Sequence, residues 1–161
     1  MVCNDLLKDH CLNNNCGKLN QCAKSCDCRS IVVCKENNKV FELTNDLNTK
    51  IYNYIIDGGV ISDETIKRCD YAICSPDNNI LILVELKGCA VNTAAIQIEN
   101  TLSIYESTFA NYKKYARIIC QSVPNMLNTP SVLRLKRKLS MEGGTLVLKT
   151  QKCSEKISSL L

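Results

Sequence analysis

Residues 70–87, DYAICSPDNNILILVELK, give the strongest indication of the fold of this chain. Two apolar runs flank the sequence PDNN, which has a strong preference for turns. We therefore predict a β-hairpin in which Ser75 pairs with Ile80. Counting back from that pair, Asp70 lies directly opposite Glu85, and residues opposite each other in an antiparallel pair share one face of the sheet.

The second strand of this hairpin ends in charged residues. The apolar run at 80–84 continues into Glu85, Leu86 and Lys87. Because residues two apart on a strand point to the same side, Glu85 and Lys87 share a face. Two carboxylates and one ammonium are therefore expected to converge beside the core, unless these charges lie at a solvated strand end. A register shift of one residue would separate Asp70 from Glu85.

The convergence of these groups suits a particular chemistry. Two neighbouring carboxylates repel each other, and a divalent cation between them removes the repulsion. Mg²⁺ accepts one or two carboxylates and keeps several waters, which can supply a nucleophile. The residue types therefore fit hydrolysis of a phosphodiester, although a Glu-x-Lys triplet also arises by chance.

The remaining patterns predict a mixed α/β fold. An antiparallel first half followed by βαβ crossings indicates a mixed central β-sheet flanked by helices. One helix is expected to begin at Asn92 or Thr93 and to run to about Tyr112, and a second covers 131–141. Strands are expected at 31–34, 40–43, 51–56, 68–75, 80–87, 115–123 and 145–149.

Cysteine is unusually abundant, with 12 in 161 residues. The N-terminal crowding divides the chain into a Cys-rich segment, residues 1–35, that could pack on the core, and a nuclease-like α/β domain, residues 36–161. Cysteines in the expected strands are interpreted as small buried hydrophobic residues: Cys69, Cys74 and Cys120.

Thiolates of the Cys-rich segment could ligate structural Zn²⁺ or an iron–sulfur cluster. The candidate ligands are Cys22, Cys26 and Cys28, with Cys16 before and Cys34 after, and their spacing is irregular and contains no Cys-x-x-Cys pair. Unligated or partly oxidised thiols are therefore favoured over zinc. His10, beside Cys11, could complete a zinc set, but an exposed histidine is favoured.

The start of the chain lacks the basic-then-apolar order of a signal peptide, and no apolar run is long enough to span a bilayer. A cytoplasmic, intracellular protein without a membrane partner is expected. The excess of Lys and Arg, 20 against 16 Asp and Glu, is small. Charge alone therefore does not indicate a nucleic-acid binder.

Asp70, the turn, the sequence ILILVELKG and a following helix that carries Gln97 together resemble the PD-(D/E)XK nuclease superfamily. The resemblance covers residues 50–150 by order of elements. It implies a restriction-endonuclease-like αβββαβ core, dependence on Mg²⁺ or Mn²⁺, and cleavage of phosphodiesters, usually in DNA. Arg68 and Cys69 stand before the Asp instead of a proline, and a helix before the first core strand is not evident.

By position, the resemblance implies that Asp70 and Glu85 bind the metal and that the Leu86 carbonyl adds a ligand. Lys87 would assist the attacking water. Gln97 matches a glutamine that some branches place near the site, and a surface amide is an equally open interpretation. Asp57, in the sequence DGG, is a further acidic candidate that we interpret as a turn residue.

Basic residues in the second half could contact phosphates, which confers affinity without sequence choice. The alternative is a solvated helix face. A homodimer would let one small domain cut both strands. The basic candidates are Lys113, Lys114, Arg134, Arg137 and Lys138, with Arg117 and Lys136 beside them.

The expected function is thus a Mg²⁺-dependent nuclease acting on nucleic acid. One alternative is a catalytically inactive nucleic-acid-binding or interaction module of the same fold. A buried acidic pair argues against it, because such a pair is costly without a role. The other alternative is a Cys-rich metal-binding or redox protein, which tightly held zinc or iron would reveal.

Overall fold

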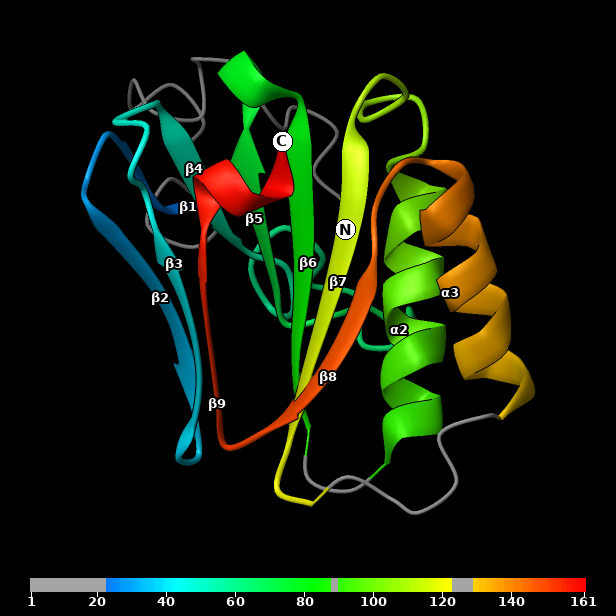
Figure 1. Cartoon of the computed structure of the whole chain (residues 1–161). Coiled ribbons are helices and arrows are strands. Elements are labelled where there is room, and N and C mark those ends of the chain that lie inside the picture. The colour runs from blue at the N-terminus through cyan, green and yellow to red at the C-terminus, as the bar shows by residue number, and fades with distance from the viewer. Residues whose placement is uncertain (1–22, 88–89, 123–128) are drawn as a thin grey trace.

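The computed structural model describes residues 23–87, 90–122 and 129–161, and these form three layers (Figure 1). A six-stranded mixed sheet lies in the middle, two helices cover one face, and a three-stranded sheet covers the other. The larger sheet has the order β1 (Ala23–Asp27), β4 (Ile51–Ile55), β5 (Tyr71–Ser75), β6 (Ile80–Lys87), β7 (Lys113–Cys120) and β8 (Leu146–Thr150).

The smaller sheet has the order β2 (Ile31–Glu36), β3 (Lys39–Thr44) and β9 (Lys152–Lys156). The helices are α2 (Val91–Ile104) and α3 (Pro130–Met141), and single 3₁₀ turns lie at Pro76–Asn78 and Ile157–Leu160. In the larger sheet, β1, β4, β5 and β6 pair antiparallel, whereas β6, β7 and β8 pair parallel. The predicted mixed sheet with flanking helices is therefore confirmed.

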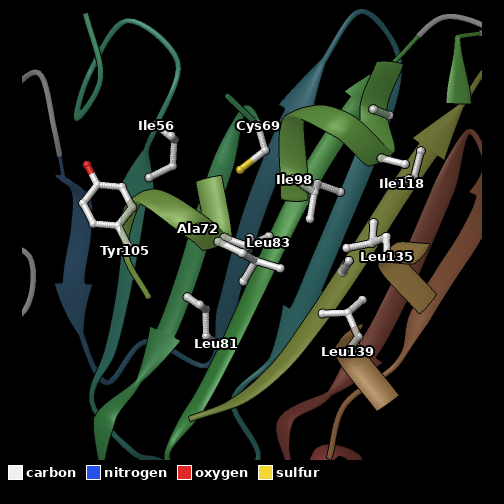
Figure 2. Close-up of a cluster of buried hydrophobic side chains, with 14 of the residues drawn as sticks. Ile56, Cys69, Ala72, Leu81, Leu83, Ile98, Tyr105, Ile118, Leu135 and Leu139 are labelled. Atoms are coloured by element: carbon white, nitrogen blue, oxygen red, sulfur yellow. The ribbon is translucent and has the colours of Figure 1, made fainter. Parts of the chain in front are cut away.

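The apolar run of β6 follows from its central position, because a strand covered on both faces has no polar side. Leu81 and Leu83 belong to the core cluster beneath the helices (Figure 2), whereas Ile82 and Val84 belong to the cluster beneath the smaller sheet. The first cluster also receives Ile98 from α2. The sheet thus separates two hydrophobic cores.

The β5–β6 hairpin has the predicted register, with Ser75 paired to Ile80 and Tyr71 paired to Val84. A 3₁₀ turn at Pro76–Asn78 makes the connection, and Asn79 closes it with a left-handed φ of 51°. Asparagine tolerates this conformation better than most residues. The turn chemistry and the strand pattern therefore specify the same pairing.

Helix α2 is shorter than predicted. It begins after Ala90 without a side-chain cap and ends at Ile104, whereas we expected a start at Asn92 or Thr93 and an end near Tyr112. Tyr105 and Phe109 lie in turns that follow the helix and are also buried. The apolar spacing therefore continues beyond the last helical residue, which made the helix look longer in the sequence. The Asn92 side chain instead accepts hydrogen bonds from Thr129 and Ser131 at the start of α3.

Two strands, β1 and β9, were not predicted from the sequence. The polar strand β9 pairs parallel with β3, and β1 pairs with β4. Gln151, with φ of 60°, turns the chain from β8 in the larger sheet to β9 in the smaller one. Residues 23–35, which we assigned to the Cys-rich segment, thus supply β1 and most of β2 to the two sheets. Among residues 23–50, which precede β4, the structure has no helix, so the helix that the resemblance implies before the first core strand is absent from this described part.

Gly144, where α3 leads into β8, is predicted to be the glycine least tolerant of substitution. A Cβ there would lie 1.8 Å from the Lys114 carbonyl oxygen, so β7 must shift. We expect Gly144→Ala to lower the free energy of unfolding by about 3 kcal/mol. Gly143→Ala, at φ of +74° but with no contact closer than 3.6 Å, should cost about 1 kcal/mol. Urea unfolding measures both, and equal costs would contradict the prediction.

Candidate active site

Asp70 and Glu85 contact each other where β5 begins and β6 ends. The Asp70 carboxylate oxygen Oδ2 accepts a hydrogen bond of 2.6 Å from the Leu86 backbone N–H. The Glu85 oxygen Oε2 accepts one of 3.2 Å from the Asp70 N–H. Each carboxylate is therefore held by the backbone of the opposite strand, one position beyond the last ladder pair.

The two carboxylates differ in exposure. Glu85 lies on the same side of β6 as Leu83, beneath the helices, and is 0% exposed. Asp70 is half-buried and opens on a groove. Burying a charge is costly unless it is paired or hydrogen-bonded. A hydrogen bond from a backbone N–H to a carboxylate is stronger than one between neutral groups, and it offsets part of this cost. The arrangement places one internal and one accessible carboxylate side by side.

Three polar residues of α2 hold the segment that leads into Asp70. They occupy helix positions i, i+3 and i+4, which lie on one side of a helix. Gln97 Nε2 donates to the Arg68 carbonyl at 2.7 Å, Asn100 Nδ2 donates to the Lys67 carbonyl at 2.5 Å, and Thr101 Oγ1 accepts from the Cys69 N–H at 3.0 Å.

Gln97 thus positions the chain before Asp70. Asn100 and Thr101 act with Gln97 although only Gln97 is predicted from the sequence, where the i, i+3, i+4 spacing of the three residues is visible. Lys87 ends β6 opposite Cys120 of β7. The Lys87 side chain lies outside the described part of the structure, so its role in catalysis stays a prediction.

An open groove of about 510 Å³ runs beside Asp70, between the turn of the β2–β3 hairpin and the larger sheet. Asp57, the further acidic candidate, lies on its wall and forms an ion pair with Arg68, whose Nε is 2.7 Å from Asp57 Oδ1. The lining residues are Glu36, Asn37, Lys39, Ile55, Asp57, Asp70, Tyr71 and Leu86.

The prediction that Lys114 contacts nucleic acid is wrong. Its side chain is 6% exposed and its Nζ lies 2.6 Å from Glu142 Oε2. Residues 114–120 of β7 are all buried, because both faces of the strand are covered, and the charge of Lys114 is offset by the carboxylate of Glu142, which follows α3. Arg117, considered with it, is also buried, with its Nε 2.8 Å from Glu155 Oε1. These two basic side chains of β7 are therefore not available to a surface ligand.

The other basic candidates lie at the surface, and Lys113 lies away from the carboxylates. Lys113 is exposed but pairs with Ile80, whereas Glu85 pairs with Ile118, so about 17 Å of strand separates them. Figure 1 shows that β7 begins at the end of the sheet opposite to where β6 ends. The candidates on α3, which are Arg134, Arg137 and Lys138, are exposed or half-buried. Arg134 forms an ion pair with Glu99 through two hydrogen bonds.

The cysteines of the expected strands are buried, as predicted: Cys69, Cys74 and Cys120. Burial raises the pKa of the Cys69 thiol well above its ordinary value, and the nearby Glu85 adds to the effect. Among the described residues, no group of three or more His, Cys, Asp or Glu side chains could hold a metal ion. The candidate zinc ligands His10, Cys11, Cys16 and Cys22 lie outside the described residues.

Thiol labelling is predicted to separate the cysteines by burial. Burial raises the pKa of Cys34 to about 12, and the thiolate is the form that reacts. In the native protein at pH 8, Cys28, which is exposed, should react with maleimide, whereas Cys34 and Cys69 should react only after unfolding. Mass spectrometry of the labelled peptides reads this out. Equal labelling rates for Cys28 and Cys34 would contradict it.

Comparison with known proteins adds no family to this geometry: no family model, no curated protein and no solved structure matches the chain. In the part of the chain that the structure describes, no helix has both the length and the apolar character needed to cross a membrane. Any function must therefore be argued from the residues and their arrangement.

Proposed function

We propose that this protein is a metal-dependent nuclease that hydrolyses phosphodiester bonds, with DNA as the expected substrate. The observation that carries the proposal is the contact between Asp70 and Glu85 at the edge of an open groove. The order β4, β5, β6, α2, β7 supports it, because it is the βββαβ part of the core that the PD-(D/E)XK resemblance implies. A central-strand carboxylate with 0% exposure is also hard to explain by stability alone.

The residues present fit a hard divalent cation. Asp70 and Glu85 supply neighbouring carboxylates, and the Leu86 carbonyl is an additional oxygen at the same strand end. Mg²⁺ or Mn²⁺ suits such a set, because Mg²⁺ needs only one or two carboxylates and keeps bound waters. When bound, the ion supplies an activated water and stabilises negative charge on a phosphoryl oxygen.

The chain's own groups set the geometry of this site. The Leu86 N–H fixes the Asp70 carboxylate, and the Asp70 N–H fixes that of Glu85. Gln97 holds the preceding turn of chain in place through the Arg68 carbonyl. Lys87, two residues after Glu85 in the sequence, would orient the attacking water. Rigid strands are a precise support for such groups.

The direct test is cleavage by the purified full chain. Supercoiled plasmid, linear duplex DNA, single-stranded DNA and RNA are incubated with Mg²⁺, with Mn²⁺ or with EDTA. We expect cleavage of at least one DNA substrate with either metal and none with EDTA. Cleavage that persists in EDTA, or no cleavage of any substrate with metal, would contradict the proposal, and the second result would favour a catalytically inactive module.

A further inference from the structure

Lys39 is an unexpected residue for its position. It begins β3, on the side of the strand that carries Phe41 and Leu43 into the core beneath the smaller sheet. Its exposed fraction is 9%. Lysine is rarely so buried unless it has an ionic partner. Its side chain therefore projects toward the larger sheet instead of toward solvent.

Among the described residues, the Lys39 ammonium has few hydrogen-bond partners. Its Nζ has one hydrogen bond, to the Asn37 carbonyl at 3.4 Å, which is near the limit for such a bond. Two groove carboxylates have other partners: Arg68 pairs with Asp57, and the Asn37 side chain donates to Glu36 at 3.3 Å. An ammonium has three donors, so Lys39 retains capacity for another acceptor.

Lys39 and Asp70 line the same groove. Lys39 lines it from the smaller sheet, and Asp70 and Leu86 line it from the larger one. Figure 1 shows the turn between β2 and β3 at the same end of the molecule as the end of β6. The volume of about 510 Å³ lies within the range of small-ligand sites. A phosphate-bearing unit would fit between the Lys39 ammonium and the Asp70 carboxylate.

We infer that Lys39 binds a backbone phosphate of the nucleic acid across the groove from Asp70. The inference rests on the proposed function and adds a positioning residue to it. Lysine binds phosphate as a compact charge, and a contact to phosphate fixes register without reading sequence. A cation held by Asp70 and Glu85 would offset their repulsion of the same backbone.

Binding measurements test the inference apart from cleavage. Anisotropy of short labelled DNA and RNA strands is measured with Ca²⁺, which has the charge of Mg²⁺ but takes more ligands at longer distances. We expect Lys39→Gln to weaken binding about tenfold and to reduce the slope of log affinity against log salt by about 0.7 to 0.9, the contribution of one phosphate contact. Lys39→Arg should restore the slope, because it retains the charge.

Lys35→Gln is the matched control. Lys35 belongs to the same hairpin but is exposed on its outer side. Its affinity and slope should stay close to wild type. A nucleoside monophosphate, measured by competition, should bind far more weakly than a strand if a continuous backbone is the ligand. Thermal unfolding checks that Lys39→Gln is folded.

The outcomes are distinct. Unchanged affinity and slope in Lys39→Gln would overturn the inference, and so would equal losses in Lys35→Gln. Loss in both Lys39→Gln and Lys39→Arg, with lower unfolding temperatures, would assign Lys39 a structural role and also overturn it. Lys39-dependent binding by a wild type that never cleaves would refute the proposed nuclease activity and leave the phosphate site standing.

Discussion

Asp70→Asn and Glu85→Gln are each expected to lower metal-dependent cleavage by about 10²–10³-fold, the loss typical of removing one group that stabilises charge in a transition state. Each change removes a negative charge from the metal site but keeps the size of the side chain. An amide oxygen can still accept the hydrogen bonds from the Leu86 and Asp70 N–H groups. The rate of plasmid cleavage with Mg²⁺ measures the effect.

Asp77→Asn is the control for this prediction. Asp77 is exposed in the 3₁₀ turn at the other end of the same hairpin, so its loss should leave cleavage unchanged. The free energy of unfolding separates function from structure. Removing one of two neighbouring like charges should leave the stability of Asp70→Asn and Glu85→Gln equal to wild type or higher. Full activity in both variants would contradict the proposed site, and so would loss of activity with global unfolding in both.

Arg117→Met is expected to destabilise the protein by about 3–5 kcal/mol, because it leaves a largely buried carboxylate without its cation. Arg117 is 2% exposed, and its Nε lies 2.8 and 2.9 Å from the two oxygens of Glu155. Its Nη1 also donates to the carbonyl oxygens of Ala116 and Thr145 at 2.9 Å. The side chain therefore joins β7, the start of β8 and β9. Urea unfolding measures the loss.

Two comparisons sharpen this second prediction. The double variant Arg117→Met/Glu155→Leu should recover part of the loss, because it removes both charges instead of stranding one. Lys152→Met breaks the more exposed pair with Glu42, at 3.2 Å, and should cost about 0–1 kcal/mol. If Arg117→Met cost no more than Lys152→Met, the buried pair would not be a principal link between the two sheets.

The hairpin that builds the site was predictable from local sequence alone. The turn PDNN and the alternation around it are local signals, and together they specify the Ser75–Ile80 pair and hence the contact between Asp70 and Glu85. Local signals suffice here because a short loop leaves the two strands few other registers. The strand β6 and the helix α3 could also be predicted, because the apolar pattern of each lies within a single segment of the sequence.

Which polar residues are buried was not predictable from local sequence, because it depends on long-range contacts. The burial of Lys39, Lys114 and Arg117 depends on partners far along the chain, so periodicity could not distinguish them from exposed basic residues. The strand β9 has a polar sequence and exists because β3 offers it an edge. Non-local pairing of this kind depends on which elements meet in space. For this physical reason, the groove and Lys39 could not be predicted from the sequence, whereas the contact between Asp70 and Glu85 within one hairpin could.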